Sequence, residues 1–269
     1  MTNLCIWLIE KVFPILMIGL FPLLLFPCAN ADEIDAAEED RYVVLKRGSG
    51  QIKIDAEFDD WRLSENVLVM GKETWEPWEG GTWDDKDDLY AELQIVYDED
   101  NLYFALLVKD DEYVAEGANP WSNDGIQIAI DSSDGVIPAG WPNATTHLYN
   151  FSIKDGWQKE TGPFLGDAEI EMRRDDDTKQ TFFEWRMPGE IIGGRGTEFK
   201  AGMEIAFAII ANDSDENAEG QKGWVGWGNH TIVHGKNPEE MKTIVLSDKT
   251  MAVNAAGKLP NTWGHIKAK

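Results

Sequence analysis

Residues 89–108 read LYAELQIVYDEDNLYFALLV, and this stretch decides the fold. Between Leu89 and Tyr97 the side chains alternate, so that Glu92 and Gln94 share one face and apolar residues occupy the other. Alternation with a period of two is typical of a half-buried strand. Four polar residues, Asp98–Asn101, then return the chain into a second β-rich run, which predicts a hairpin.

Similar short runs continue on both sides of this hairpin. They cover Ile52–Ile54, Gly125–Asp131, His147–Lys154, Ala168–Arg173, Phe182–Met187, Glu204–Ala211, Gly223–Trp227 and Lys242–Leu246. Clusters of Gly, Pro, Asn and Asp separate them, and no long helical period intervenes. About ten short strands without long helices predict an all-β fold, an antiparallel, jelly-roll-like β-sandwich.

The N-terminal segment has the features of a secretory signal. Lys11 precedes the apolar run Val12–Phe26, which is shorter than the roughly 20 residues of a spanning helix and is broken by proline and glycine. A small-x-small cleavage site follows and ends at Ala31. We therefore predict a signal peptide over residues 1–31 and a secreted or periplasmic protein. Lipidation of Cys28 and an uncleaved anchor are the alternatives.

The remaining chain is predicted to be one domain. Residues 32–46 begin with small and acidic residues and are expected to be a flexible acidic lead-in, while residues 47–269 form the β-sandwich. Cys5 and Cys28, which both lie in the signal, are the only cysteines. Cleavage would therefore leave a protein without disulfides or cysteine-ligated zinc.

The net charge and the absence of known catalytic motifs exclude several classes of function. The formal net charge is −25, and a surface this acidic repels nucleic acid and anionic lipid, whereas neutral ligands and cations remain compatible. The sequence has no nucleophile elbow, phosphate loop or His-Glu-x-x-His motif. Glu184, beside Trp185, is interpreted as a strand-face residue rather than one of the paired carboxylates of a glycosidase. We expect no catalytic residues and no enzyme activity.

Tryptophan is unusually abundant, with 12 in the chain. Four are expected in the core: Trp61, Trp185, Trp224 and Trp227. Five others lie in polar loops: Trp75, Trp78, Trp83, Trp121 and Trp141. An indole in a polar loop offers its face to the C–H surface of a pyranose, while nearby polar groups bond the hydroxyls. The loop tryptophans therefore indicate a saccharide site.

Four segments occur in an order that resembles the family 9 carbohydrate-binding modules of xylanases and related secreted bacterial proteins. They are Ile52–Trp61, Val96–Asp110, Asn119–Asp131 and Ile209–Asp213. The resemblance extends over about Gln51–Leu246 and implies a β-sandwich in which two aromatic rings clamp a sugar.

The resemblance also implies site residues. Trp121, in the Asn-Pro-Trp segment, corresponds to one clamping ring. Gln127 stands where the family has an acidic hydroxyl acceptor, and Asn150 corresponds to a family asparagine. The second ring is expected just before Asn237, where this chain has His234 instead of tryptophan. Either His234 stacks, or the site is lost, or another ring replaces it. The candidates are Trp83, Trp141 and Trp227.

A calcium site is the next expectation. Residues 212–217 concentrate oxygen ligands in a loop, although without EF-hand spacing. Asp213 and Asp215 in this loop are the candidate ligands. The resemblance supports the expectation, because family 9 modules hold structural calcium. A solvated acidic turn is the alternative interpretation.

The sequence thus predicts a monomer that binds a neutral saccharide and assists polysaccharide breakdown as a non-catalytic accessory module of glycoside hydrolases. After signal cleavage, we expect it to bind neither nucleic acid nor membrane. One alternative is a secreted haem-binding electron-transfer domain of a related β-sandwich group, with Met187 and either His147 or His234 as axial ligands, although a methionine at a strand end is usually core filler. The other alternative is a structural or adhesion module.

Overall fold

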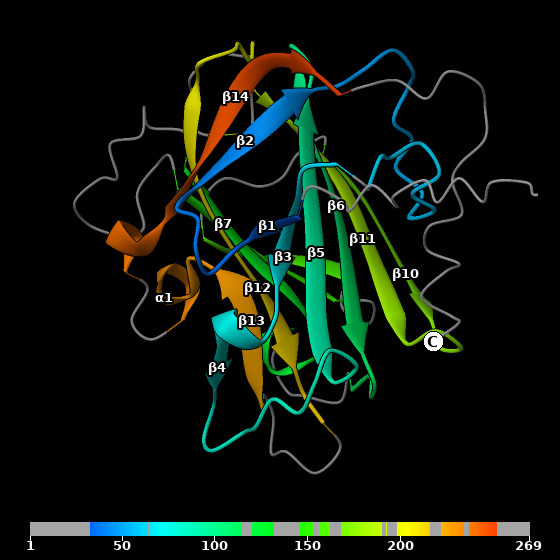
Figure 1. Cartoon of the computed structure of the whole chain (residues 1–269), viewed down its shortest axis with the longest axis vertical. Coiled ribbons are helices and arrows are strands. Elements are labelled where there is room, and N and C mark those ends of the chain that lie inside the picture. The colour runs from blue at the N-terminus through cyan, green and yellow to red at the C-terminus, as the bar shows by residue number, and fades with distance from the viewer. Residues whose placement is uncertain are drawn as a thin grey trace, which may run out of the picture.

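The computed structural model shows a chain dominated by strands (Figure 1). It describes residues 33–63, 65–114, 120–131, 146–152, 156–161, 168–189, 192, 198–215, 222–233 and 237–251. Within these residues 14 strands join in one sheet. The predicted all-β class is confirmed.

The strands are β1 (Glu33–Asp35), β2 (Arg41–Lys46), β3 (Val67–Met70), β4 (Trp75–Pro77), β5 (Leu89–Tyr97), β6 (Asn101–Asp110), β7 (Gly125–Asp131), β8 (Thr146–Ser152), β9 (Gly156–Thr161), β10 (Glu169–Asp175), β11 (Gln180–Pro188), β12 (Glu204–Asp213), β13 (Gly223–Trp227) and β14 (Lys242–Thr250). The helical turns are η1 (Lys72–Thr74), η2 (Pro120–Ser122), α1 (Asn229–Ile232) and η4 (Pro238–Glu240).

The sheet folds over on itself and encloses the main core. Its order is β10-β11-β6-β5-β2-β14-β12-β7-β8-β9, and Figure 1 shows β2 and β14 crossing the top between the two halves. Rings from both halves meet inside. Phe104 of β6 stacks on Phe207 of β12 at 5.7 Å, and Trp185 of β11 stacks on Phe151 of β8 at 5.7 Å. These contacts join the two layers of the sandwich.

The hairpin predicted from residues 89–108 is formed by β5 and β6, in a register that places Leu93 opposite Leu106. The inward residues, such as Leu93 and Ile95, are fully buried in the main core. The outward residues are more buried than a half-buried strand requires, because an irregular segment covers them. Ile52, Phe58 and Trp61 pack there in a second apolar cluster.

The strand expected at Ile52–Ile54 is wrong. The segment is irregular: the nitrogen of Lys53 donates to the Asp60 carboxylate at 2.7 Å, and a carboxylate of β11 holds the residues that follow. Glu184 accepts hydrogen bonds from the backbone nitrogens of Asp55 (2.9 Å) and Ala56 (2.7 Å) and from Nε1 of Trp61 (2.6 Å). Glu184 is fully buried, so it fastens the segment to the sheet.

The N-terminal lead-in over residues 32–46 is also not a flexible segment where the structure describes it. From Glu33 it contributes β1 and β2, and β2 lies inside the sheet between β14 and β5. Tyr42 and Val44 are fully buried, and the Tyr42 hydroxyl donates to the carbonyl of Asn66 at 2.6 Å. The β1–β3, β2–β5 and β2–β14 pairings are parallel, so the antiparallel prediction fails for these pairs.

The predicted signal peptide lies outside the described residues. Over the described ranges, no helix has the length and apolar character that a membrane crossing requires.

Candidate functional site

The outer face of β7, β8 and β12 carries the candidate site. Ile126, Ile128 and Ile130 point into the main core, so Gln127 and Ala129 project from the opposite face. On this outer face Ala129 packs with Ile232 of α1 and with other apolar residues in a third cluster. Gln127 lies two residues before Ala129 on the same face, and the polar region begins there.

Three amides line this polar region. Gln127 and Asn150 are directly opposite each other on β7 and β8. Nε2 of Gln127 donates to Oδ1 of Asn212 on β12 at 3.1 Å. The three side chains are 4%, 3% and 2% exposed, in the order Gln127, Asn150, Asn212. We call them the amide row.

Oδ1 of Asn150 is buried and has no hydrogen-bond partner among the described residues. A buried acceptor without a donor costs about 1–3 kcal/mol, so this oxygen favours a donor supplied from outside.

Trp121 lies at the end of the amide row. It belongs to η2, immediately before β7, and its carbonyl is 3.5 Å from Nδ2 of Asn212. The indole is 44% exposed, one of the most exposed large apolar side chains in the described residues. The structure thus brings together Trp121, Gln127 and Asn150, which the sequence singled out, and adds Asn212.

A buried carboxylate holds the turn that carries Trp121. Asp124 is 2% exposed and accepts hydrogen bonds from the backbone nitrogens of Val114 and Ser214, the latter at 2.7 Å. Burial, together with the charge of Asp110, raises the pKa of Asp124 well above its ordinary value. This arrangement joins η2 to the end of β12, where Asn212 lies.

Of the proposed replacements for the second ring, Trp227 is buried in the core and Trp83 packs partly against it. Trp227 is 1% exposed, and its Nε1 donates to the carbonyl of Glu39 at 2.5 Å. Trp83 is half-buried against the main core, and its Nε1 donates to the carbonyl of Leu89 at 2.8 Å. Both indoles serve the core. Trp141 and His234 lie outside the described residues.

The four tryptophans expected in the core are confirmed there. Their exposed fractions are 3% for Trp61, 1% for Trp185, 0% for Trp224 and 1% for Trp227. Met187, considered above as a haem ligand, is fully buried in the main core, so packing accounts for it. The side chain of His147 is not among those that the structure describes.

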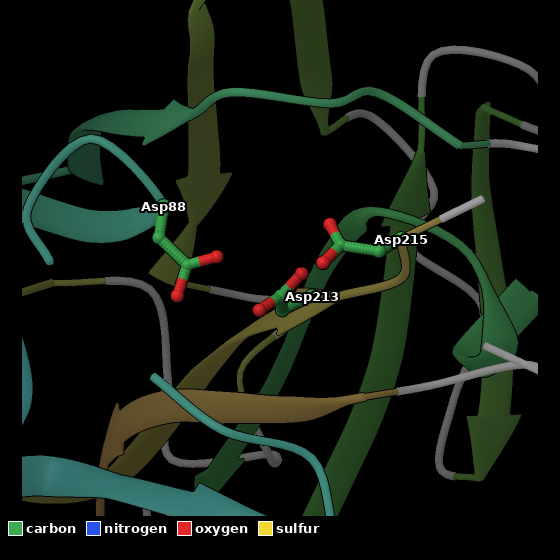
Figure 2. Close-up of side chains that lie close together, drawn as sticks. All are labelled: Asp88, Asp213 and Asp215. Atoms are coloured by element: carbon green, nitrogen blue, oxygen red, sulfur yellow. The ribbon is translucent and has the colours of Figure 1, made fainter. Parts of the chain in front are cut away.

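Asp213 and Asp215 lie at the end of β12 beside Asp88, which precedes β5. Figure 2 shows the three side chains close together, and one oxygen of each lies within 4.8 Å of the others. Asp88 is not among the predicted calcium ligands, because it lies far from Asp213 and Asp215 in the sequence. We call this group the acidic triad.

The ammonium group of Lys222 lies beside the acidic triad. Its Nζ is 2.6 Å from Oδ1 of Asp88, 2.8 Å from Oδ2 of Asp215 and 3.5 Å from Oδ2 of Asp213. Burial lowers the pKa of this amine, but the hydrogen bonds of Asp215 and Asp88 outweigh burial, and the pKa is raised overall.

Asp213 is the least satisfied member of the triad. Burial raises its pKa to about 8, against the opposing charge of Lys222. Both its carboxylate oxygens are buried without a hydrogen-bond partner in the described part of the chain. Three carboxylates facing one ammonium group leave negative charge uncompensated. Carboxylate oxygens suit a hard cation such as Ca²⁺, and the triad would supply part of the six to eight oxygen ligands that this ion takes.

Comparisons with known proteins agree with this architecture. Endo-1,4-beta-xylanase A of Thermotoga neapolitana is 32% identical over 86 residues, which are 30% of this chain and 7% of that protein. This chain therefore corresponds to a small part of that relative.

Two solved structures of a carbohydrate binding module family 9 protein from Caldicellulosiruptor kristjanssonii share the fold. The complex with glucose has a TM-score of 0.59 at 17% identity and covers 80% of this chain and 99% of that one. The complex with cellotriose has a TM-score of 0.60 at 16% identity and covers 81% and 98%.

The sequence itself matches the family described as "Carbohydrate family 9 binding domain-like" over residues 54–249. This match includes the hairpin, the amide row and the acidic triad, and the chain belongs to that family.

Proposed function

We propose that this protein binds a neutral saccharide non-catalytically, with Trp121 as the stacking ring and the amide row as the polar base. The observation that carries the proposal is the exposed indole of Trp121, a residue whose backbone carbonyl contacts the row of three buried amides, on a family 9 fold.

The chemistry of these groups suits an uncharged sugar. An indole face packs against the C–H groups of a pyranose, and amides both donate to and accept from hydroxyl groups. None of the three amides carries a charge, so the amide row itself offers no ion pair to an anionic or cationic ligand. Oδ1 of Asn150 is a buried acceptor without a partner among the described residues, and a sugar hydroxyl would reach it only after the groups that cover it move.

The carboxylates nearest the amide row have other roles. Hydrolysis of a glycosidic bond needs two carboxyl groups that flank the bond. Asp124 is buried and bonded to backbone N–H groups, and Asp213 belongs to the acidic triad. We therefore propose an exported accessory module that assists polysaccharide breakdown and leaves hydrolysis to other proteins.

Calorimetric titration against a panel of neutral mono- and oligosaccharides tests this function. Loss of a stacking ring costs roughly 1–3 kcal/mol, so Trp121→Ala should weaken binding by about tenfold or more while the thermal midpoint changes little. Val43→Ala is the matched control, because Val43 is equally exposed, at 44%, but lies on β2. Wild-type binding by the Trp121→Ala variant would remove Trp121 from the site.

We further propose that the acidic triad holds a structural calcium ion. The side-chain oxygens of Asp88, Asp213 and Asp215 would be ligands, and the Lys222 amine would have to move aside. Calcium should raise the thermal midpoint of protein pretreated with a chelator, and Asp88→Asn should abolish that response. Equal midpoints with and without calcium, or an unchanged response in Asp88→Asn, would exclude the site.

A further inference from the structure

We propose that Lys222 substitutes for the calcium ion of the acidic triad, so that the protein keeps its fold and its saccharide site when calcium is absent. The inference rests on the proposed calcium site and on the proposed saccharide site. It adds to them a residue that sets how strongly both depend on metal.

The ammonium group of Lys222 lies where a cation shared by the triad would lie. Its Nζ is within 3.5 Å of a carboxylate oxygen of each member, and the Lys222 side chain is 11% exposed. The three carboxylates are turned toward one another (Figure 2). A metal ion that bound all three would lie at the ammonium group or directly beside it. Two cations this close repel each other strongly in a buried site, so the ammonium group and calcium exclude each other.

The acidic triad needs a positive charge at this position. Asp213 is fully buried, and neither of its carboxylate oxygens has a hydrogen-bond partner among the described residues, so it depends on the Lys222 amine at 3.5 Å. Removing one partner of a buried ion pair is strongly destabilising, because the other charge is left uncompensated. Without an ammonium group or a metal ion, the carboxylates would repel one another and separate Asp88 from the end of β12.

The backbone of Lys222 is held in place on both sides. Its nitrogen donates to the carbonyl of Asp213 at 2.6 Å, and its carbonyl accepts from the nitrogen of Trp78 at 2.9 Å. The next residue, Gly223, begins β13 and pairs with Asp213 and Pro77. Exchange of the ammonium group for calcium therefore requires the Lys222 side chain to move, while its backbone can stay in the sheet.

The aliphatic stem of Lys222 packs against the turn that carries Trp78. The carbonyl of Trp78 accepts from the nitrogen of Gly81 at 2.9 Å, which closes this turn. A Cβ at Gly81 would come within 1.9 Å of the Lys222 carbonyl oxygen and 2.8 Å of its Cγ, so the close approach requires glycine. Contacts along the whole residue thus hold the ammonium group at the triad.

The end of β12 connects the acidic triad to the saccharide site. Asn212 of the amide row directly precedes Asp213. Ser214 follows, and its hydroxyl donates to the carbonyl of Ser122 at 3.3 Å. Ser122 directly follows Trp121 in η2. Carboxylates that move apart would therefore displace both the amide row and the turn that carries the indole of Trp121.

Thermal unfolding in chelator and in saturating calcium tests the inference on the wild type, Lys222→Met and Lys242→Met. Methionine keeps an apolar stem and removes the charge. Lys242→Met is the matched control, because Lys242 pairs with the exposed Asp40 and lies opposite Phe207, toward the other end of β12.

In chelator, Lys222→Met should unfold roughly 6–20 °C below the wild type, because the carboxylates lose their counter-charge. Calcium should raise the midpoint of Lys222→Met several times more than that of the wild type, and Lys242→Met should respond to calcium like the wild type.

Calorimetric titration with the saccharide that the wild type binds most tightly tests the connection to the saccharide site. Wild-type affinity in chelator should be within about threefold of its value in calcium, whereas Lys222→Met should lose about tenfold or more in chelator and regain it in calcium. Equal affinities of Lys222→Met in the two conditions would exclude the connection.

The outcomes separate this inference from the proposed function. A Lys222→Met protein that calcium stabilises no more than it stabilises the wild type, whether the variant is folded in chelator or not, would overturn the inference. Loss of wild-type saccharide binding in chelator would overturn it as well. A wild type that does not respond to calcium, beside a Lys222→Met variant that does, would overturn the calcium site of the native protein and support the substitution by Lys222. If the wild type binds no saccharide, the proposed saccharide site falls, and the thermal measurements still decide the role of Lys222.

Discussion

Replacing Glu184 tests how the irregular segment over residues 51–62 is held against β11. The carboxylate is fully buried and accepts three hydrogen bonds: Oε2 accepts the nitrogens of Asp55 and Ala56, and Oε1 accepts Nε1 of Trp61. Each hydrogen bond to a charged group contributes about 1.5–3 kcal/mol, and the three are not additive. Glu184→Ala leaves three buried donors without an acceptor, so we expect it to lower the free energy of unfolding by about 3–5 kcal/mol.

Glu184→Gln gives a finer measurement. The amide oxygen can keep the two backbone donors, but the amide nitrogen then faces the indole N–H of Trp61, and two donors oppose each other. We expect a loss of about 1–3 kcal/mol, which falls by about 1 kcal/mol when Trp61→Phe removes the opposing N–H.

Urea denaturation followed by circular dichroism, with a double-mutant cycle, measures these values. A Glu184→Ala loss below about 1 kcal/mol, or a cycle without coupling to Trp61, would refute this account of the segment.

Two further predictions concern stability. Burial, followed by the charge of Glu33, raises the pKa of Glu92 from its ordinary 4.5 to about 7. The stabilising contribution of its protonated form is complete below about pH 4.5 and is lost as the pH rises through about 7. Glu92→Gln should therefore raise the free energy of unfolding by about 1–3 kcal/mol at pH 8 and leave it nearly unchanged at pH 4, in denaturation series at both pH values; equal effects at both would contradict the assignment. Gly81→Ala should lower the thermal midpoint, because its Cβ would meet the Lys222 carbonyl oxygen at 1.9 Å, at a cost of about 1–3 kcal/mol. An unchanged midpoint would show that the turn carrying Trp78 can relax.

Local pattern sufficed where a strand pairs with its neighbour in the chain. The hairpin of β5 and β6 follows from period-two alternation and a polar turn, and the predicted bounds of β7 and β13 agree with the structure. The pairing of β7 with β8 places Gln127 directly opposite Asn150, and both side chains lie on the outer face of the sheet.

Most of the structural features that the sequence did not predict depend on contacts between residues that are distant in the sequence. β2 follows an acidic stretch that looks disordered, and it becomes a strand because β14 and β5 flank it. The irregular path of residues 51–62 depends on Glu184, which is far along the chain. Asp88 joins Asp213 and Asp215 only when the start of β5 meets the end of β12. The alternation of polar and apolar residues within one segment does not show which distant segments that segment will contact.

Asn212 was within reach of sequence reasoning. It is the fourth residue of the Ile209–Asp213 segment, and alternation from the buried Ile209 predicts an inward side chain at Ala211 and an outward one at Asn212. The signal for a site residue was the polar Asn212, which follows the apolar Ile210 on the same outward face of the strand.

A crystal structure of the protein with the tightest-binding oligosaccharide of the panel tests the central claim most directly. We expect one pyranose ring against the indole of Trp121, with hydroxyl groups bonded to the amide row. A saccharide bound on another face, with Trp121 and the amide row free of ligand, would contradict the account.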